Sequence, residues 1–238
     1  MAATHLWGTI DGTEITFPMR VEEFNAATLT YSVPARQAAA LLPGSSFELV
    51  ETAPGVGCLV IAACDFRRNP WGDYNELNVG FLSRPAGAGD ETVGSFIYRM
   101  PVNQPFTCEA GNMVMGFPKT VETISAGYDG GGFTFRVSSP AGLPALTLGF
   151  PRRPAPLGPP VVLTVESYSY LDGHPYATAA EMEIGSDAVD PSEVSLELGE
   201  GPLADELRGL GLPVAPDSCV WGEGLRATFQ LGRRLVTA

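Results

Sequence analysis

The chain has 238 residues, of which 45% are hydrophobic and 17% charged, and this balance is typical of a compact globular protein with one sizeable core. A net charge of −13 disfavours nucleic acids and anionic membrane surfaces as partners, because both attract basic proteins. No apolar run approaches the roughly 20 residues of a spanning helix, and the N-terminal residues lack the pattern of a signal peptide. We therefore expect a cytoplasmic protein that forms a single domain over residues 1–238.

Most of the chain reads as β-strands separated by turns. Residues 7–10 and 14–17 flank Asp11-Gly12, a dipeptide that favours the tight turn of a hairpin. Alternation and β-branched or aromatic residues predict further strands at residues 29–33, 47–51, 58–64, 74–82, 95–102, 133–137, 145–148, 161–170, 177–184, 193–198 and 225–231. With 28 glycines and 21 prolines for turns, the pattern predicts an antiparallel meander that closes into a barrel or folds into a sandwich.

Two short helices are expected among these strands. One covers residues 35–42, an alanine-rich stretch that a Pro-Gly pair stops, and the other covers residues 203–210 and starts directly after a proline. The proline-rich segment 150–160 is expected to connect two layers of the same domain, since the remainder of the chain holds too few strands for a core of its own. The predicted fold class is mainly β, within the β-rich α+β range.

The common motifs of metal and cofactor enzymes are missing from the sequence. There is no nucleophile elbow, no dinucleotide fingerprint and no phosphate-binding loop, and the only histidines are His5 and His174, both in segments typical of the surface. The four cysteines are far apart with no Cys-x-x-Cys pair, so we expect buried free thiols. We therefore expect neither a metal site nor a cofactor.

Lysine is the unusual residue of this chain, because Lys119 is the only one among 14 basic residues. Arginine and lysine can both serve as a surface cation, but only the amine of lysine can lose its proton in an apolar pocket and become a nucleophile. Lys119 follows Met115, Gly116, Phe117 and Pro118, an apolar segment whose glycine and proline restrict the backbone. We expect the side chain of Lys119 to be buried and held in a fixed direction by its backbone. The alternative is an ordinary exposed lysine.

A second segment supplies a carboxylate that could work with this amine. Strand alternation places Tyr74, Glu76 and Asn78 on one face, while the other face is apolar. In an ordinary sheet the polar face would be exposed to solvent. In a barrel the same face would line a ligand cavity and bring Glu76 to Lys119 as a proton donor or acceptor.

Arg99 stands in a largely apolar and aromatic stretch and therefore needs a partner. Two roles are open: an ion pair with a structural carboxylate, or a bidentate contact with the carboxylate of a substrate.

Two of these segments resemble acetoacetate decarboxylase and its superfamily. They are the Tyr-x-Glu strand at residues 74–76 and the aromatic-Pro-Lys sequence at residues 117–119, which occur in the family's order and at a similar spacing. The resemblance implies an antiparallel β-barrel with short peripheral helices, assembled as a homo-oligomer. It also implies a Schiff-base lysine at Lys119, activated by its surroundings, and an active-site carboxylate at Glu76.

The chain also departs from the pattern of that family. A second lysine follows the reactive one in the decarboxylase, whereas Thr120 stands here. The family's early-strand arginine falls near Phe24, and its other carboxylate near Leu59. Burial is then the main means of activating the amine, and the departures favour a changed reaction.

The predicted function is that of a lyase acting on a small keto acid. Lys119 would form an imine that releases carbon dioxide from a β-keto acid, and Glu76 would move the protons. One alternative is an aldolase or aldolase-dehydratase using the same enamine, and another is a barrel that binds an apolar small molecule without reacting. The residues expected to contact the substrate are Tyr74, Arg99, Met115 and Phe117.

Overall fold

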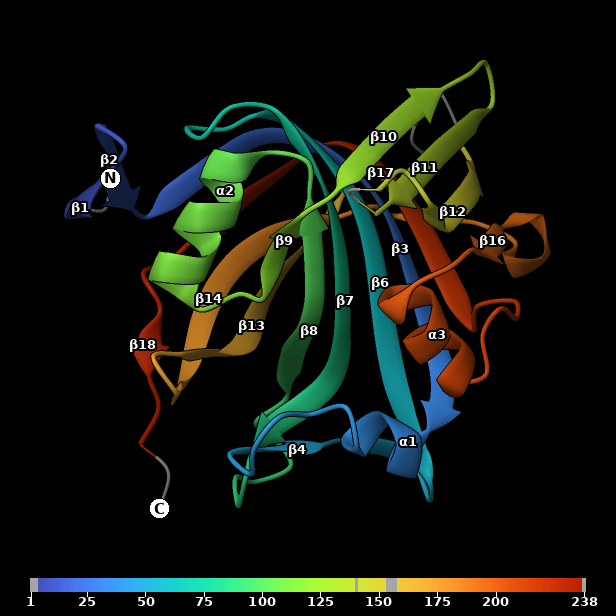
Figure 1. Cartoon of the computed structure of the whole chain (residues 1–238), viewed down its shortest axis with the longest axis horizontal. Coiled ribbons are helices and arrows are strands. Elements are labelled where there is room, and N and C mark those ends of the chain that lie inside the picture. The colour runs from blue at the N-terminus through green and yellow to red at the C-terminus, as the bar shows by residue number, and fades with distance from the viewer. Residues whose placement is uncertain (1–3, 140, 153–157, 237–238) are drawn as a thin grey trace.

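The computed structural model describes residues 4–139, 141–152 and 158–236, and its centre is a closed β-barrel (Figure 1). Within these residues the barrel has seven strands, each paired with the next and the last paired with the first. In barrel order the strands are β17 (Ser218–Phe229), β3 (Met19–Pro34), β6 (Val56–Arg68), β7 (Tyr74–Pro85), β8 (Gly94–Val102), β13 (Val161–Leu171) and β14 (His174–Ile184). All neighbours are antiparallel except β8 and β13, which run parallel. The predicted β-rich barrel is therefore confirmed, with one parallel pair in it.

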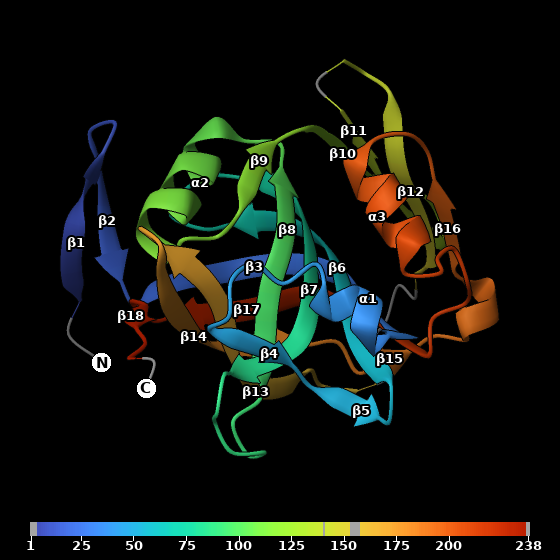
Figure 2. The same cartoon turned by 60° about the horizontal axis from the view of Figure 1, so that its bottom comes forward.

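A second sheet lies to one side of the barrel with α3 (Pro202–Gly209) beside it, as Figure 2 shows. Its strands are β10 (Thr123–Tyr128), β11 (Gly132–Ser138), β12 (Pro144–Pro151) and β16 (Ser195–Leu198). The main hydrophobic core joins this sheet to the outer face of β3, β6 and β7, and its largest members include Tyr31, Phe81, Phe135 and Trp221. The apolar faces of both sheets are buried by this packing.

The remaining elements are short and lie around the barrel. The predicted hairpin is confirmed as β1 (His5–Ile10) and β2 (Thr13–Phe17), on the opposite side of the barrel from the second sheet (Figure 2). The others are α1 (Ala35–Ala39), β4 (Phe47–Leu49), β5 (Glu51–Ala53), β15 (Asp187–Ala188), a 3₁₀ turn at Pro191–Glu193, and β18 (Arg233–Arg234). Among the described helices, none is long and apolar enough to cross a bilayer.

Strand alternation separates the core from the barrel interior. On β6, Leu59 and Ile61 point outward into the core, whereas Val60 and Ala62 line a cavity inside the barrel. Sequence alternation predicts such a division whenever both faces of a strand are covered. Leu59, which falls near the family's second carboxylate in the sequence comparison, therefore lies outside the barrel interior.

One helix that the sequence did not predict covers an end of the barrel. It is α2 (Pro105–Ala110), which continues as a π-helical turn over Gly111–Met115 and then leads into β9 (Lys119–Val121) beside β8 (Figure 1). Gln104 caps its start, since the side-chain oxygen accepts a hydrogen bond from the Thr107 N–H at 3.1 Å. The helix was missed because it is short and lacks apolar periodicity.

Two predicted elements are shorter in the structure. The helix expected at 35–42 ends at Ala39, where the chain tightens into a turn, and the strand expected at 193–198 begins only at Ser195. Asp190 holds the preceding residues in a 3₁₀ turn by accepting a hydrogen bond from the Ser192 N–H at 2.9 Å. Part of the proline-rich connection, residues 153–157, lies outside the described residues.

Candidate active site

The side chain of Lys119 points into the end of the barrel that α2 covers. Its backbone pairs with Met100 on β8, and the residue is only 7% exposed. The amine donates a hydrogen bond to Glu76 Oε2 at 2.8 Å and lies 3.4 Å from Thr107 Oγ1 on α2. The only lysine of the chain is therefore a buried residue, as the sequence predicted.

Glu76 reaches this position from the inward face of β7. It is 6% exposed and stands opposite Cys64 on β6 and Val102 on β8 in the strand registers. A carboxylate removed from water is costly unless it is paired, and the amine of Lys119 supplies the pair. The structure thus brings together the two residues that the sequence singled out.

Three aromatic rings lead from the barrel wall to the amine. Phe24, Phe66 and Tyr74 are neighbours across β3, β6 and β7, with ring centroids 5.3 Å and 4.6 Å apart in stacked geometry. The Tyr74 ring then lies 5.2 Å from Lys119 Nζ, close enough for a cation–π contact. Burial, followed by the negative charge of Glu76, raises the pKa of Tyr74 well above its ordinary value, so the phenol stays protonated.

Gly111 makes room for the Lys119 side chain at the start of the π-helical turn. A Cβ atom on this glycine would lie 2.6 Å from Lys119 Cδ and 2.7 Å from Cε. These distances are far shorter than carbon atoms tolerate, and Gly111 itself has ordinary helical dihedral angles. The glycine is therefore required by the lysine rather than by its own backbone.

Asn112 holds the backbone of Lys119 from both sides of the residue. Its Oδ1 accepts a hydrogen bond from the Lys119 N–H at 2.9 Å, and its Nδ2 donates to the Lys119 carbonyl at 3.2 Å. A backbone fixed in this way limits how far the side chain can wander from Glu76.

The segment between the π-helical turn and the lysine is fixed against β13. Gly116 has a left-handed φ of 64°, and a Cβ there would lie 2.4 Å from the Tyr170 carbonyl oxygen. Ser169 donates a hydrogen bond to the Met115 carbonyl at 2.7 Å. Met115 and Phe117 are both buried in the same apolar cluster as Tyr74, and neither lines the cavity inside the barrel.

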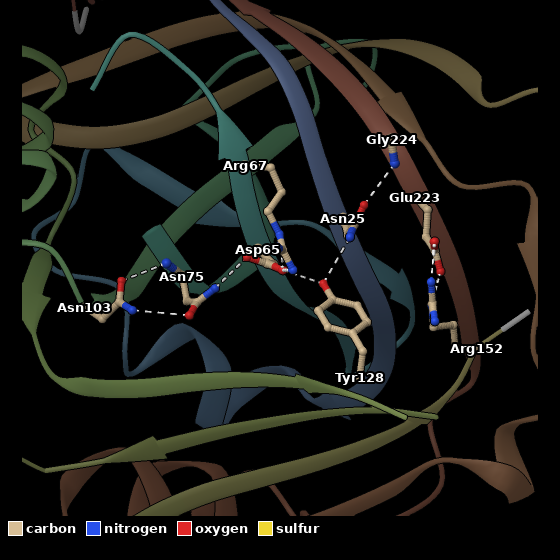
Figure 3. Close-up of polar contacts among 9 residues, drawn as sticks. All are labelled: Asn25, Asp65, Arg67, Asn75, Asn103, Tyr128, Arg152, Glu223 and Gly224. Carbon is tan, nitrogen blue, oxygen red and sulfur yellow. Dashed lines mark hydrogen bonds and ion pairs between the residues drawn. The ribbon is translucent and has the colours of Figure 1, made fainter. Parts of the chain in front are cut away.

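A network of polar side chains anchors the strand that carries Glu76 (Figure 3). Asn75, the residue between Tyr74 and Glu76, donates from Nδ2 to Asp65 Oδ1 at 2.9 Å. Its backbone N–H donates to Asn103 Oδ1 at 2.8 Å, and Asn103 lies just before α2. The network therefore ties β6 and β7 to the segment that leads into α2.

The same network reaches the second sheet through Tyr128. Its hydroxyl donates to Asp65 Oδ2 and accepts a hydrogen bond from Asn25 Nδ2 at 3.1 Å, while the guanidinium carbons of Arg67 and Arg152 each lie 5.3 Å from its ring centroid (Figure 3). Burial, and then the hydrogen bond to Asp65, raise the pKa of Tyr128 to about 12. The phenol is therefore a neutral link between the barrel and the second sheet.

A cavity of about 300 Å³ lies inside the barrel, on the inward face of β6 and β7 next to Glu76. Cys64 and Asn78 line it, and they flank Glu76 as its cross-strand neighbour and as the next inward residue of β7. Burial, followed by the charge of Glu76, raises the pKa of the Cys64 thiol, which makes it a neutral wall residue rather than a nucleophile. Glu76 and Lys119 do not line the cavity themselves, so the cavity begins at the residues that flank Glu76.

Arg99 is not brought to this site. Its guanidinium forms two hydrogen bonds with the carboxylate of Glu206 on α3, one of them at 3.1 Å, and it stacks 5.0 Å from the Tyr98 ring centroid. Arg99 also lines a pocket of about 180 Å³ with Thr120 and Glu122 on the other side of β9 from the Lys119 side chain. Of the two roles considered for Arg99, the geometry matches the structural ion pair.

Sequence reasoning did not find Thr107, Gly111 or Asn112, which surround Lys119. All three lie on α2 and the π-helical turn, the elements absent from the prediction. The available signal was Pro105 at the first position of a helix, preceded by a capping residue.

The chain belongs to the acetoacetate decarboxylase family, because the family model for acetoacetate decarboxylase matches residues 10–221. Among curated proteins, none matches the sequence significantly. The fold is similar to acetoacetate decarboxylase from Legionella pneumophila subsp. pneumophila str. Philadelphia 1, with a TM-score of 0.67 and 16% identity over 92% of this chain and 87% of that one.

Two further solved structures share the fold. The enduracididine biosynthesis enzyme MppR, complexed with pyruvate, has a TM-score of 0.57 and 18% identity over 94% of this chain and 92% of that one. An acetoacetate decarboxylase-like enzyme from Sphingomonas wittichii RW1 has a TM-score of 0.53 and 15% identity, covering 92% of this chain and 94% of that one. The fold is therefore shared by enzymes with different names.

Proposed function

We propose that this chain is a lyase that forms a Schiff base between Lys119 and a keto acid and releases carbon dioxide from a β-keto acid. The observation that carries the proposal is the buried amine of the only lysine, 2.8 Å from a buried carboxylate whose neighbours Cys64 and Asn78 line a cavity. An amine, a proton acceptor and a dry space for a carbonyl compound are the parts that imine chemistry requires.

In the first stage, Glu76 takes a proton from the Lys119 ammonium along their hydrogen bond. The nitrogen lone pair then attacks the keto carbon, and the carbonyl oxygen receives the proton from Glu76 to give a carbinolamine. A second transfer through Glu76 moves a proton from nitrogen to this hydroxyl, water leaves, and a C=N⁺ iminium forms. Glu76 ends as a carboxylate, so one group serves as base and acid in turn.

In the second stage, the iminium accepts the electrons of the breaking bond. The bond between the α-carbon and the carboxylate breaks, its electron pair forms the enamine double bond, and the C=N⁺ pair returns to nitrogen. Carbon dioxide leaves, the enamine carbon takes a proton, and water hydrolyses the iminium to a ketone and Lys119. The Tyr74 ring face, 5.2 Å from Nζ, stabilises the cationic iminium.

The charge of the cavity wall favours decarboxylation. Among the described residues that line the cavity there is no lysine, arginine or histidine, and the charged members are Glu166 and Glu183. A carboxylate kept through the reaction needs a cation to hold it, whereas one that departs as carbon dioxide is favoured by an apolar surrounding that strips its water.

Aldol chemistry is the second candidate, and the similarity to MppR favours it. That structure is described as complexed with pyruvate, and a pyruvate imine gives an enamine. If this enamine attacked an aldehyde carbon instead of taking a proton, the same Lys119 and Glu76 would form a new carbon–carbon bond. An aldolase or aldolase-dehydratase would result.

Product analysis separates these candidates. The purified protein is incubated with β-keto acids, and separately with pyruvate plus an aldehyde, while carbon dioxide and condensation products are followed. We expect carbon dioxide from a β-keto acid, and none with Lys119→Arg, which keeps a cation beside Glu76 but cannot form the imine. If only condensation products form, the aldol reaction replaces decarboxylation as the proposed function. If neither carbon dioxide nor a condensation product forms, the protein is a barrel that binds its ligand without reacting.

A further inference from the structure

The cavity is built from layers of inward-facing residues on three neighbouring strands. Ala26, Cys64 and Glu76 form the layer nearest the lysine, since they are cross-strand partners on β3, β6 and β7. The next layer is formed by Thr28, Ala62 and Asn78, and the one after it by Val60 and Gly80. Successive layers are about 7 Å apart along the strands.

Small side chains leave the space open along this line. Ala26 and Ala62 present only methyl groups to the barrel interior, and both line the cavity. The cavity continues past them to Leu82 on β7 and Gly94 at the start of β8. Its lining therefore begins at Ala26 and Cys64, in the same layer as Glu76, and runs along the strands of the barrel.

The wall along this line is mainly apolar. The apolar side chains that line it include Phe24, Val60, Leu82, Ile97, Met182, Ile184 and Leu225. Phe24 falls near the sequence position at which the family has its early-strand arginine. The wall is therefore apolar where the family pattern has a cation.

The two acids in the lining already have partners. Glu166 pairs with Arg233 at 2.9 Å, and Glu183 accepts a hydrogen bond from the Arg226 backbone N–H at 2.8 Å. Neither acid attracts a negatively charged group, and the described lining contains no cation that would. A second carboxylate on the ligand would therefore be disfavoured in this space.

We propose that the substrate is a β-keto acid whose keto carbon carries an uncharged apolar chain longer than the methyl group of acetoacetate. The chain lies along the cavity, from the layer of Ala26 and Cys64 past the layer of Ala62. This inference rests on the proposed function, because it uses imine formation at Lys119 to fix one end of the substrate. A cavity of about 300 Å³ lies at the lower end of the range that encloses drug-sized ligands, which leaves room for such a chain.

The expected preference follows from the burial of methylene groups. Each methylene moved from water into an apolar site improves affinity about fourfold. A chain with four more carbons than acetoacetate, as in 3-oxooctanoate, is then favoured on the order of 100-fold.

The first test compares kcat/KM for decarboxylation of acetoacetate, 3-oxohexanoate, 3-oxooctanoate and the dicarboxylate 3-oxoadipate. We expect kcat/KM to rise with the length of the alkyl chain and to be lowest for the dicarboxylate. Equal values for acetoacetate and 3-oxooctanoate, or a preference for 3-oxoadipate, would overturn the inference while leaving the imine chemistry intact.

A second readout does not depend on turnover. Binding of the ketone products is measured by calorimetry, and 2-heptanone is expected to bind on the order of 100-fold more tightly than acetone. If no keto acid is turned over but this difference is found, the proposed reaction fails and the apolar-chain site stands. Equal weak binding of both ketones rejects the site whatever the turnover shows.

Narrowing the cavity at one layer tests the placement of the chain. Ala62→Leu, and independently Thr28→Leu on the neighbouring strand, should remove most of the preference for 2-heptanone over acetone and for 3-oxooctanoate over acetoacetate. The matched control is Ala86→Leu, which adds the same groups at an exposed position outside the lining. An unchanged chain-length preference in both narrowing variants would contradict the proposed path.

Discussion

Lys119 Nζ lies 2.8 Å from Glu76 Oε2, and the two residues meet from β9 and β7 with less than a tenth of either exposed to solvent. A buried ion pair of this kind couples the site to the stability of the fold, because neither charge has water to replace its partner. This one contact therefore leads to predictions for both the stability and the catalytic rate of the protein.

Removing one partner of this pair should destabilise the protein strongly. Lys119→Met leaves Glu76 buried without a partner, and we expect a loss of about 3–5 kcal/mol in the free energy of unfolding. Urea unfolding of this variant, of Glu76→Leu and of the double variant measures the cycle. The double variant should recover much of the loss; additive losses would show that the two side chains are not coupled.

Glu76 should matter for the rate and the Arg99–Glu206 pair should not. Glu76→Gln keeps the shape of the side chain but cannot take the ammonium proton, so we expect kcat to fall by about 10²–10⁴. The control is Glu206→Gln, which changes another ion-paired glutamate. Its partner Arg99 is half-exposed, so we expect the free energy of unfolding to change by less than about 1 kcal/mol. A large fall in kcat for Glu206→Gln would return Arg99 to the active site.

Gly111→Ala should disturb the position of Lys119. Alanine is preferred over glycine in helices by up to about 1 kcal/mol, but its Cβ would lie 2.6 Å from Lys119 Cδ and force the side chain away from Glu76. Because this separates a buried ion pair, we expect a lower melting temperature together with a rate of imine formation reduced at least tenfold. Gly209→Ala in α3, where nothing lies within 4 Å of the new Cβ, is the matched control and should keep full activity.

The contact between the barrel and the second sheet should weaken in alkali through Tyr128. Its folded-state pKa of about 12 lies above the value of 10.0 for an unperturbed tyrosine, so the folded state holds the proton more tightly. This contribution is fully present below pH 10 and is lost as the pH rises from about 10 toward 12. Chemical unfolding across this range measures the slope, which should be shallower in Tyr128→Phe; the same slope in both proteins would exclude Tyr128 as its source.

The strands, and Glu76 and Lys119 within the site, could be predicted because local sequence patterns indicate them. Alternation along residues 74–82 separates the face of Glu76 from the apolar core, and the absence of other lysines draws attention to Lys119. Glu76 and Lys119 meet only because the sheet closes into a barrel. The strand pattern alone did not distinguish a barrel from a sandwich.

The rest of the site depends on contacts that no local pattern reports. Gly111 and Asn112 owe their roles to a π-helical turn that places them against Lys119, and the sequence around them lacks the periodicity of a helix. The partner of Arg99, Glu206, lies 107 residues away on α3, so the choice between a structural and a substrate carboxylate needed the tertiary structure.

Reductive trapping tests the imine at Lys119 most directly. The protein is treated with borohydride in the presence of acetoacetate, 3-oxooctanoate or pyruvate, and its peptides are mapped by mass spectrometry. We predict a reduced adduct on the peptide that contains Lys119, loss of activity in proportion to it, and no such adduct in Lys119→Arg. Full retention of unmodified Lys119 with all three keto acids would contradict the account.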